Sequence, residues 1–209
     1  MAPAHPGRPS HPPSPRPAKT DRPSRGTRPF PKPILGVDID NVLAQSDACL
    51  RSMIRRQFRI DLDEQDITQY DYSAYGLTEI QLTEIFESFN TEHCRTLKVI
   101  PGAKAALTLL SARFEIVLVT SRNPASKEGT EYWLRRKGLH YDQLHFNDEK
   151  HALGIPYQAF VEDRHEHAHR IAATGARVFL MTRPWNAHPL AHPNVQRVET
   201  WREILRHLL

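Results

Sequence analysis

Short apolar runs alternate with amphipathic stretches along most of the chain. Five of these runs are rich in β-branched or aromatic residues and are bounded by turn-forming or charged residues, which is typical of buried strands. They predict strands at residues 34–37, 115–120, 143–146, 157–162 and 177–181. From the second strand onward, the intervening segments have helical character. Strands that alternate with helices predict an α/β protein with a doubly wound, five-stranded parallel sheet that is covered on both faces.

The segment between the first two predicted strands has helical periodicity instead. Its apolar residues form two stripes at helical spacing, Leu50, Met53, Ile54 and Phe58 in the first and Leu82, Ile85, Phe86 and Phe89 in the second. Thr78 and Gln81, just before the second stripe, have the spacing of a capping box. We therefore predict a small helical cap at residues 45–99, inserted after the first strand into a core made of residues 34–44 and 100–209.

The segment after the fifth predicted strand has two parts. Residues 183–194 are rich in Pro, His and Asn and predict a loop, whereas residues 201–209 predict a closing helix. This loop begins with Arg183, Trp185 and Asn186. These residues either border the pocket or belong to a plain surface loop.

The first 33 residues differ in composition from the rest. They hold 11 of the 17 prolines, seven Lys or Arg and one Asp. With so little apolar surface to bury, residues 1–33 predict a disordered tail. We interpret the tail as an inert extension in preference to a weak electrostatic contact with RNA, DNA or an acidic partner. The remaining 176 residues hold 21 basic and 23 acidic side chains, so they have no nucleic-acid signature of their own.

The number of cysteines and the length of the apolar runs indicate in which cellular compartment we expect the protein. Cys49 and Cys94 are too few and too far apart for a disulfide framework. No run approaches the ~18 apolar residues of a membrane span, and the N-terminus lacks the apolar stretch of a signal peptide. We expect a cytoplasmic protein without membrane contact, and the oligomeric state stays open.

Two carboxylates follow the first strand, at Asp38 and Asp40. Side chains two residues apart on an extended strand point to the same side. A desolvated carboxylate costs several kcal/mol unless it is paired or bound to a metal. Ligands of open parallel sheets bind at the carboxyl ends of the strands. The pair therefore marks a candidate site just past the first strand.

Polar groups also follow the later strands. The second strand ends in Thr120, Ser121 and Arg122, whose hydroxyls and guanidinium are suitable donors to phosphate oxygens. The fourth strand ends in acidic and basic groups at Glu162, Asp163 and Arg164. Between them Lys150 begins a predicted short helix, where a cation opposes the helix dipole and so needs another reason to be present.

The order of these groups resembles a known arrangement. Asp-x-Asp, Thr-Ser, Lys and Glu-Asp, each after a predicted strand, follow the four-motif order of the haloacid dehalogenase (HAD)-like superfamily over residues 34–186. Within it, the segments DIDNVLA, DITQYDY, VLVTSR, FVEDRHEHA and TRPWN resemble bacterial nucleotidase-like proteins related to 5′(3′)-deoxyribonucleotidases. The resemblance implies a Rossmann-like core, a cap and phosphatase activity.

The resemblance also implies roles for the matching residues. Asp38 is the expected nucleophile, which forms a phosphoaspartyl intermediate. Asp40 is the expected general acid and base. Thr120 and Ser121 would bind the phosphoryl group, and Lys150 would neutralise it and orient Asp38.

Mg²⁺ is the cofactor that the resemblance implies. Its expected ligands are Asp38, the backbone carbonyl of Asp40 and Asp163, since Mg²⁺ prefers a few oxygen ligands with waters to a full protein cage. Many members have Asp where this chain has Glu162. We expect Glu162 to lie outside the ligand shell or to serve as a second ligand.

Other positions depart from the pattern or compete with it. The residue after the second Asp is usually Gly in this group and is Asn41 here, but Asn tolerates a left-handed backbone. We therefore expect the turn to be kept. Lys127 and Arg122 are rivals to Lys150 for the phosphate role, and Lys150 is favoured because it precedes the fourth strand. Arg164 is a further candidate.

A second motif points to different chemistry. Residues His165 to His169, HEHAH, match H-E-x-x-H, in which two histidines bind zinc beside a catalytic Glu. The chain has 12 histidines, so a chance match is a serious explanation. The motif also falls where the phosphatase pattern places the next helix. We disfavour a zinc peptidase, whereas adventitious binding of Zn²⁺ or Ni²⁺ at His165, His167 and His169 stays open.

The sequence therefore predicts a Mg²⁺-dependent phosphomonoesterase that acts on a nucleoside 5′-monophosphate or deoxynucleotide. One alternative is a phosphatase of another small phosphate ester. Another is a non-catalytic relative that binds a phosphoprotein or nucleic acid, using the tail. The candidates to stack on a base or sugar are Tyr70, Tyr72, Tyr75, Phe86 and Phe89. Phe86 and Phe89 share the apolar stripe of a predicted helix, so we interpret these two in preference as core.

Overall fold

A computed structural model describes residue 1 and residues 31–189 and 191–209. The chain divides after Pro31, and the fold described here is that of the unit Lys32–Leu209. Most of the predicted tail, residues 2–30, lies outside the described residues. Among the residues that are described, no helix has the length and apolar character needed to cross a membrane.

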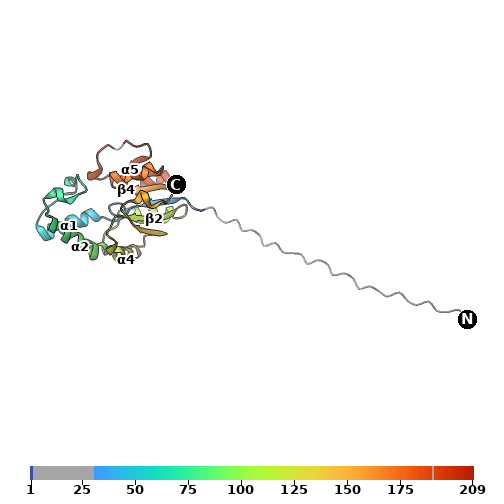
Figure 1. Cartoon of the computed structure of the whole chain (residues 1–209), viewed down its shortest axis with the longest axis horizontal. Coiled ribbons are helices and arrows are strands. Elements are labelled where there is room, and N and C mark those ends of the chain that lie inside the picture. Colours follow the sequence, from blue (N-terminus) through green and yellow to red (C-terminus); the bar gives the residue numbers. More distant parts are fainter. Residues whose placement is uncertain (2–30, 190) are drawn as a thin grey trace. The chain divides into compact units, whose positions relative to one another are not determined.

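A parallel sheet forms the centre of the unit (Figure 1). Its strands are β1 (Ile34–Val37), β2 (Glu115–Thr120), β3 (Gln143–Phe146), β4 (Tyr157–Glu162), β5 (Arg177–Met181) and β6 (Val195–Val198). They lie in the order β3-β2-β1-β4-β5-β6, and every neighbouring pair is parallel. The predicted α/β class is confirmed, and β1 lies in the interior of the sheet between β2 and β4.

The prediction of five strands was wrong, because the described sheet has six. The additional strand, β6, pairs with β5 at the edge of the sheet. Its sequence, Val-Gln-Arg-Val, has polar residues at its two middle positions, and only Val198 is buried. A strand with so little apolar character gives no buried-strand pattern in the sequence.

Helices cover both faces of the sheet. One face is covered by α5 (His165–Ala173), and the other by α3 (Ala103–Leu110), α4 (Lys127–Lys137) and α6 (Trp201–Leu208). Short 3₁₀ turns connect several elements, at Pro124–Ser126, Lys150–Leu153 and Pro184–Asn186.

The side chains of β2 show how the two faces divide the core. Ile116 and Leu118 belong to the same apolar cluster as Trp133 of α4, whereas Val117 and Val119 belong to the cluster of Ile171 on α5. Alternate residues of a strand point to opposite faces, so this division is the expected consequence of an apolar run without polar positions. It confirms the doubly wound arrangement.

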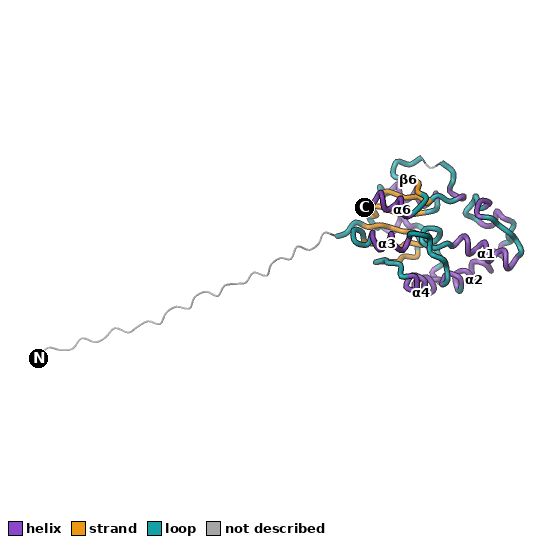
Figure 2. Tube along the Cα trace, turned by 180° about the vertical axis from the view of Figure 1, so that it is seen from behind, coloured by secondary structure: helices purple, strands orange, loops and turns teal. Residues whose placement is uncertain are grey.

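The segment between β1 and β2 is helical. It contains α1 (Ser46–Phe58) and α2 (Glu79–Thr91), which lie together to one side of the sheet in Figures 1 and 2. Three 3₁₀ turns complete it, at Glu64–Asp66, Tyr72–Tyr75 and His93–Arg95. The predicted capping box begins α2, where Thr78 accepts the backbone N–H of Gln81.

Residues at the two ends of this helical segment pair with each other. Ala44 and Val99 form an isolated antiparallel bridge. Gln45 N–H donates to Lys98 O at 2.9 Å, and Ile100 N–H donates to Leu43 O at 2.8 Å. The chain therefore leaves the core and returns to it at adjacent points.

Candidate active site

The turn after β1 brings both predicted aspartates to the carboxyl edge of the sheet. Asp38 N–H donates to Val161 O of β4 at 3.0 Å. Asn41 has φ 58°, in the left-handed region, so the expectation that the turn is kept without Gly is confirmed. Its side-chain Oδ1 accepts the backbone N–H of Asp47 at 2.9 Å. The turn is thereby joined to the start of α1.

Lys150 lies against two buried carboxylates. Its Nζ is 2.6 Å from Asp38 Oδ1 and 2.8 Å from Glu162 Oε2. Burial alone would lower the pKa of Lys150, but the two carboxylates raise it above its ordinary value. Burial raises the pKa of Asp38 to about 7 against the opposing effect of Lys150. The ammonium is therefore held charged next to the predicted nucleophile.

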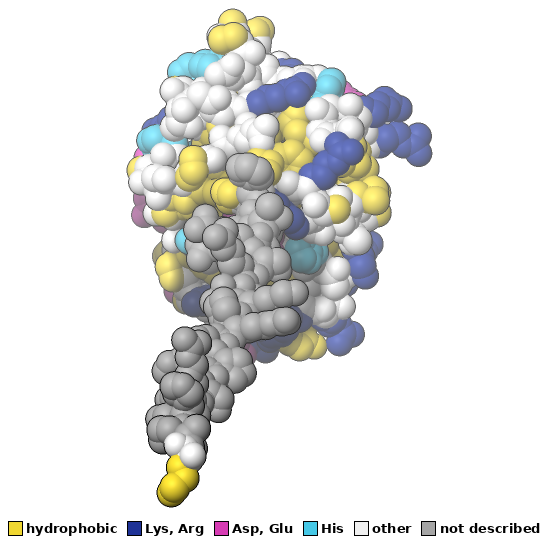
Figure 3. All heavy atoms as spheres, turned by 90° about the vertical axis from the view of Figure 1, so that its right-hand side faces the viewer, with side chains coloured by type: hydrophobic (Ala, Val, Ile, Leu, Met, Phe, Trp, Pro, Cys, Tyr) yellow, Lys and Arg dark blue, Asp and Glu magenta, His cyan; other side chains and the backbone are white. Residues whose placement is uncertain are grey.

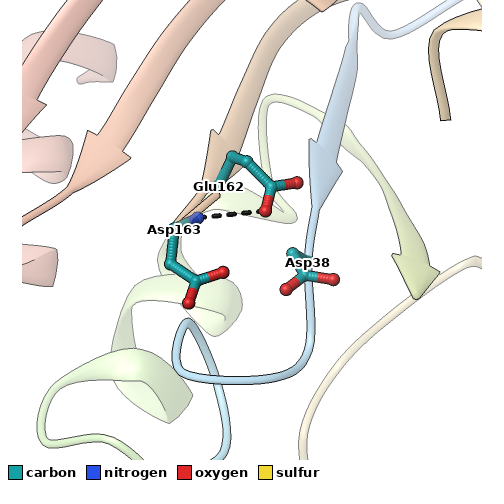
Figure 4. Close-up of side chains that lie close together, drawn as sticks. All are labelled: Asp38, Glu162 and Asp163. Atoms are coloured by element: carbon teal, nitrogen blue, oxygen red, sulfur yellow. Dashed lines mark hydrogen bonds between the residues drawn. The ribbon is translucent and has the colours of Figure 1, made fainter. Parts of the chain in front are cut away.

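Three buried carboxylates from two neighbouring strands converge, as Figure 4 shows. Single oxygens of Asp38, Glu162 and Asp163 all lie within 4.8 Å of one another. Burial, reinforced by the charges of Asp38 and Glu162, raises the pKa of Asp163 well above its ordinary value. A divalent cation would relieve this repulsion, and the oxygen donors are of the kind that Mg²⁺ binds.

Glu162 has protein partners for both of its oxygens. Oε1 accepts the backbone N–H groups of Asp163 and Arg164, each at 3.1 Å, and Oε2 accepts from Lys150. Burial would raise the pKa of Glu162, but Lys150 and His167 lower it well below its ordinary value. Glu162 is therefore ionised and holds Lys150 in place. Its oxygens are less available to bind a metal than those of Asp163.

Residues after β5 hold Asp163 in place. Trp185 Nε1 donates to Asp163 Oδ2 at 3.2 Å. Asn186 Nδ2 donates to the backbone carbonyls of Asp163 and Met181, each at 2.7 Å. Of the three residues that begin the predicted loop, Trp185 lines the cavity at the site and Asn186 supports Asp163 from behind.

Asp40 is held by Arg122 and not by Lys150. Arg122 Nη2 lies 2.8 Å from Asp40 Oδ1, and Arg122 Nε lies 2.9 Å from Oδ2. The hydroxyl of Ser46 also donates to Asp40 Oδ1. Burial would raise the pKa of Asp40, but Arg122 and Ser46 together lower it. The carboxyl is fixed in place by these donors.

The two hydroxyls at the end of β2 have different surroundings. Thr120 is fully buried, and its Oγ1 accepts the backbone N–H of Arg122 at 3.2 Å. Ser121 lines the cavity, and its buried Oγ has no hydrogen-bond partner among the described residues. The Ser121 hydroxyl is thus the one of the two with open capacity toward a ligand.

The rival cations occupy separate places. Lys127 is exposed at the start of α4 and does not line the cavity. The guanidinium of Arg164 lies 4.3 Å from the ring centre of Tyr70 and 3.6 Å from Asp148 Oδ1. Lys150 is therefore the lysine that the fold places beside Asp38.

A cavity of about 170 Å³ opens over these groups. Its polar lining includes Asp38, Asp40, Ser121, Arg122 and Lys150. Its aromatic lining consists of Tyr70, Tyr72, Phe86, Phe89 and Trp185. Phe86 is 41% exposed, so its interpretation as core was wrong, whereas Phe89 is buried as expected. Ser46, Asn90 and Asn123 also line the cavity and were missed, because single polar residues in helices or turns carry no sequence signal of their own.

The histidines of the HEHAH segment lie on α5. His167 is buried, with Nε2 3.4 Å from Asp148 and Nδ1 3.8 Å from Glu162. The ring of His169 lies edge-to-face against that of His192. Within the part of the chain that the structure describes, the cluster of three metal-ligating groups contains carboxylates only.

Known proteins are similar to this chain in sequence. A family model described as 5′ nucleotidase, deoxy (pyrimidine), cytosolic type C protein matches residues 32–209. The nucleotidase CA_C3379 of Clostridium acetobutylicum is 25% identical over 173 residues, which cover 80% of this chain and 89% of that protein.

Solved structures show the same fold. The haloacid dehalogenase-like hydrolase SP0104 from Streptococcus pneumoniae aligns with a TM-score of 0.60 and 12% identity, over 85% of this chain and 99% of that one. The haloacid dehalogenase-like protein ATU0790 from Agrobacterium tumefaciens aligns with a TM-score of 0.60 and 14% identity, over 84% and 97% of the two chains. The chain described here belongs to the family of 5′ nucleotidase, deoxy (pyrimidine), cytosolic type C proteins, and is a nucleotidase, a phosphoric monoester hydrolase with a HAD-like fold.

Proposed function

We propose that this nucleotidase is a Mg²⁺-dependent phosphomonoesterase that works through a phosphoaspartyl intermediate on Asp38. The observation that carries the proposal is the placement of Asp38, buried at the end of β1 and 2.6 Å from the Lys150 ammonium. Phosphoryl transfer depends mainly on positioning and charge stabilisation. A fixed carboxylate beside a buried cation and an open cavity supplies both.

The donor set fits Mg²⁺. Asp38 and Asp163 would hold it with carboxylate oxygens, and the backbone carbonyl of Asp40, which accepts no hydrogen bond from the described residues, would supply a third oxygen. When bound, Mg²⁺ would neutralise phosphate charge and the mutual repulsion of the carboxylates. Glu162 accepts a hydrogen bond from Lys150 and stays outside this set of metal ligands.

The reaction on this chain's residues has two halves. In the first, Asp38 attacks phosphorus, the phosphorus–oxygen ester bond breaks, and the leaving oxygen takes a proton from the protonated form of Asp40. In the second, a water attacks phosphorus and gives a proton to Asp40, and the bond between phosphorus and Asp38 breaks. Lys150 stays protonated throughout, and the Ser121 hydroxyl donates to a phosphoryl oxygen.

We assign the substrate as a nucleoside 5′-monophosphate, with deoxynucleotides included. The cavity combines the polar site with an aromatic wall, and such a wall suits the planar face of a base. Residues 45–99 act as the cap that supplies most of this wall. The family to which the chain belongs supports the same assignment.

The tail is not assigned a part in catalysis. In the body of the protein, 21 basic side chains are balanced by 23 acidic ones. On the face that Figure 3 shows, Lys and Arg side chains are dispersed among hydrophobic and uncharged groups. We therefore propose no nucleic-acid partner for the body of the protein, and the setting that we propose is the cytoplasm.

The test is a panel of nucleoside monophosphates and other phosphate esters assayed with Mg²⁺. Wild type is compared with Asp38→Asn, and Asp61→Asn, an exposed aspartate that does not line the cavity, is the matched control. We expect nucleotide turnover to be lost only in Asp38→Asn. Acid-quenched single turnovers with ³²P-labelled substrate should trap label on wild type. Equal turnover in wild type and Asp38→Asn would reject the proposal.

A further inference from the structure

The guanidinium of Arg122 is fixed on several sides. Nε and Nη2 hold Asp40, and Nη1 donates to Thr130 Oγ1 of α4 at 3.0 Å. The rings of Phe89 and Trp133 lie over its central carbon, with ring centres at 5.6 and 5.9 Å. Its side chain is 2% exposed although it lines the cavity. A guanidinium packed in this way has a rigid fork that fits a carboxylate.

The two oxygens of Asp40 are held unequally. Oδ1 accepts from Ser46 and from both Nε and Nη2 of Arg122. Oδ2 accepts only from Arg122 Nε among the described residues. The carboxyl is thus anchored through Oδ1, and Oδ2 keeps capacity to exchange a proton with a ligand.

Both anchors connect Asp40 to the helical segment between β1 and β2. Ser46 is the first residue of α1, and Phe89, which packs over the guanidinium, belongs to α2. Arg122 itself follows β2 of the core. The place of the Asp40 carboxyl is therefore set jointly by the core and by the segment that lines the aromatic wall.

We infer that Arg122 is a positioning residue for Asp40, which holds that carboxyl at the leaving oxygen of the substrate, and that it is not a ligand of the transferred phosphoryl group. This rests on the proposed function, in which Asp40 exchanges a proton with the leaving oxygen. Replacement of Arg122 should therefore change kcat by an amount that depends on the leaving group. A nucleoside leaves as an alkoxide and needs a proton, whereas p-nitrophenolate is a weak base and leaves without one.

The experiment compares a nucleoside 5′-monophosphate with p-nitrophenyl phosphate. We expect Arg122→Gln to lower the ratio of kcat on the nucleotide to kcat on p-nitrophenyl phosphate by about 10–100-fold, since a misplaced catalytic group costs on the order of 10²-fold. Arg122→Lys should restore part of the ratio. The Ki of inorganic phosphate should stay unchanged. Arg135→Gln, which makes the same change at an exposed arginine of α4, is the control and should leave the ratio at its wild-type value.

Two further variants keep the test decisive if Arg122→Gln fails to fold. Ser46→Ala removes the other donor to Asp40 and should lower the same ratio, with Arg122 still in place. In an Asp40→Asn background, Ser46→Ala should lower the ratio no further, because Ser46 acts through Asp40.

Other outcomes would overturn the inference. An equal loss on both substrates with a raised Ki for inorganic phosphate would make Arg122 a phosphate ligand. An equal loss of kcat on both substrates, with an unchanged Ki for inorganic phosphate and a lower Tm, would show that Arg122 has only a structural role. Because Asp38→Asn abolishes both activities if the proposed function holds, failure of that function is seen separately.

Discussion

The charge balance of the site depends most on a single residue, Lys150. Its ammonium is the hydrogen-bonded partner of two buried carboxylates, Asp38 and Glu162. Removal of one member of a buried ion pair leaves the other charge uncompensated, which costs about 3–5 kcal/mol. Lys150 is therefore expected to contribute to folding as well as to phosphate binding.

Lys150→Met should lower the free energy of unfolding by roughly 3–5 kcal/mol and lower kcat by on the order of 10²-fold or more. Lys127→Met changes an exposed lysine that does not line the cavity, and it should alter neither quantity. Urea denaturation and steady-state kinetics measure the two effects. Loss of activity in Lys127→Met with activity kept in Lys150→Met would transfer the phosphate role to Lys127.

The turn after Asp40 gives a second prediction for single residues. Asn41 has φ 58° and its side chain accepts the N–H of Asp47. Asn41→Ala loses this hydrogen bond and also adds left-handed strain, whereas Asn41→Gly loses the bond without the strain. We expect Asn41→Gly to be more stable than Asn41→Ala by about 1–2 kcal/mol. Thermal unfolding measures the difference, and equal stability of the two variants would contradict it.

Elements with a continuous apolar run could be predicted from the sequence, and those without one could not. Strands β1 to β5 lie where they were expected, because their buried residues leave a clear run. Strand β6 was missed because three of its four residues are only partly buried. Phe86 shows a related limit, since helical spacing indicates a face of a helix but not whether that face meets the core or a cavity.

The candidate site shows the same division between what sequence can and cannot predict. The carboxyl ends of parallel strands meet at one edge of a sheet, so the convergence of Asp38, Glu162 and Asp163 followed from the order of the elements. The contacts of Arg122 with Asp40 and of Ser46 with Asp40 depend on side-chain conformations in the folded state. Residue spacing does not encode them, and they came from the structure alone.

At the scale of elements, close packing of β1 on β4 gives a further prediction. A Cβ added at Gly36 would lie 2.1 Å from the ring of Phe160, which is fully buried. Gly36→Ala should therefore lower the free energy of unfolding by about 1–3 kcal/mol, the usual cost of overpacking. The double variant Gly36→Ala/Phe160→Leu should recover part of the loss. Denaturant titration measures both, and an unchanged stability of Gly36→Ala would contradict the packing argument.

At the scale of the whole molecule, the proposed metal site links ligand binding to stability. Burial, with the charges of Asp38 and Glu162, raises the pKa of Asp163 in the folded state. The folded protein then binds this proton more tightly than the unfolded chain, so stability is lost as pH rises from the unfolded pKa through the folded one. Above that range, ionised Asp163 destabilises the metal-free protein.

Asp163→Asn removes that charge. In chelator at pH 8 it should have a higher Tm than wild type, by about 2–4 °C for each kcal/mol of repulsion relieved. Added Mg²⁺ should raise the Tm of wild type, because a ligand that binds only the folded state stabilises it, and should leave that of Asp163→Asn almost unchanged. Differential scanning calorimetry tests both expectations. A Mg²⁺-dependent rise of the same size in both proteins would remove Asp163 from the metal site.

The tail and the catalytic body are expected to act independently. A chain that begins at residue 31 should keep the kcat and KM of the full-length protein, because the proposed catalytic residues all lie in Lys32–Leu209. If the tail binds RNA, only the full-length protein should bind it, with an affinity that falls as salt rises. Parallel kinetic and RNA-binding assays of the two chains decide the matter. Reduced catalysis in the shorter chain would contradict independence.

The paired residues Ala44 and Val99 bear on how such an enzyme can diversify. The inserted segment begins and ends at neighbouring points of the core. A change in its length therefore leaves the sheet almost unaffected, and added residues cost little loop-closure entropy. Insertions are tolerated best where chain ends lie close together. New substrate ranges can therefore arise by replacement of residues 45–99 as a module, while the strand that carries Asp38 is inherited intact.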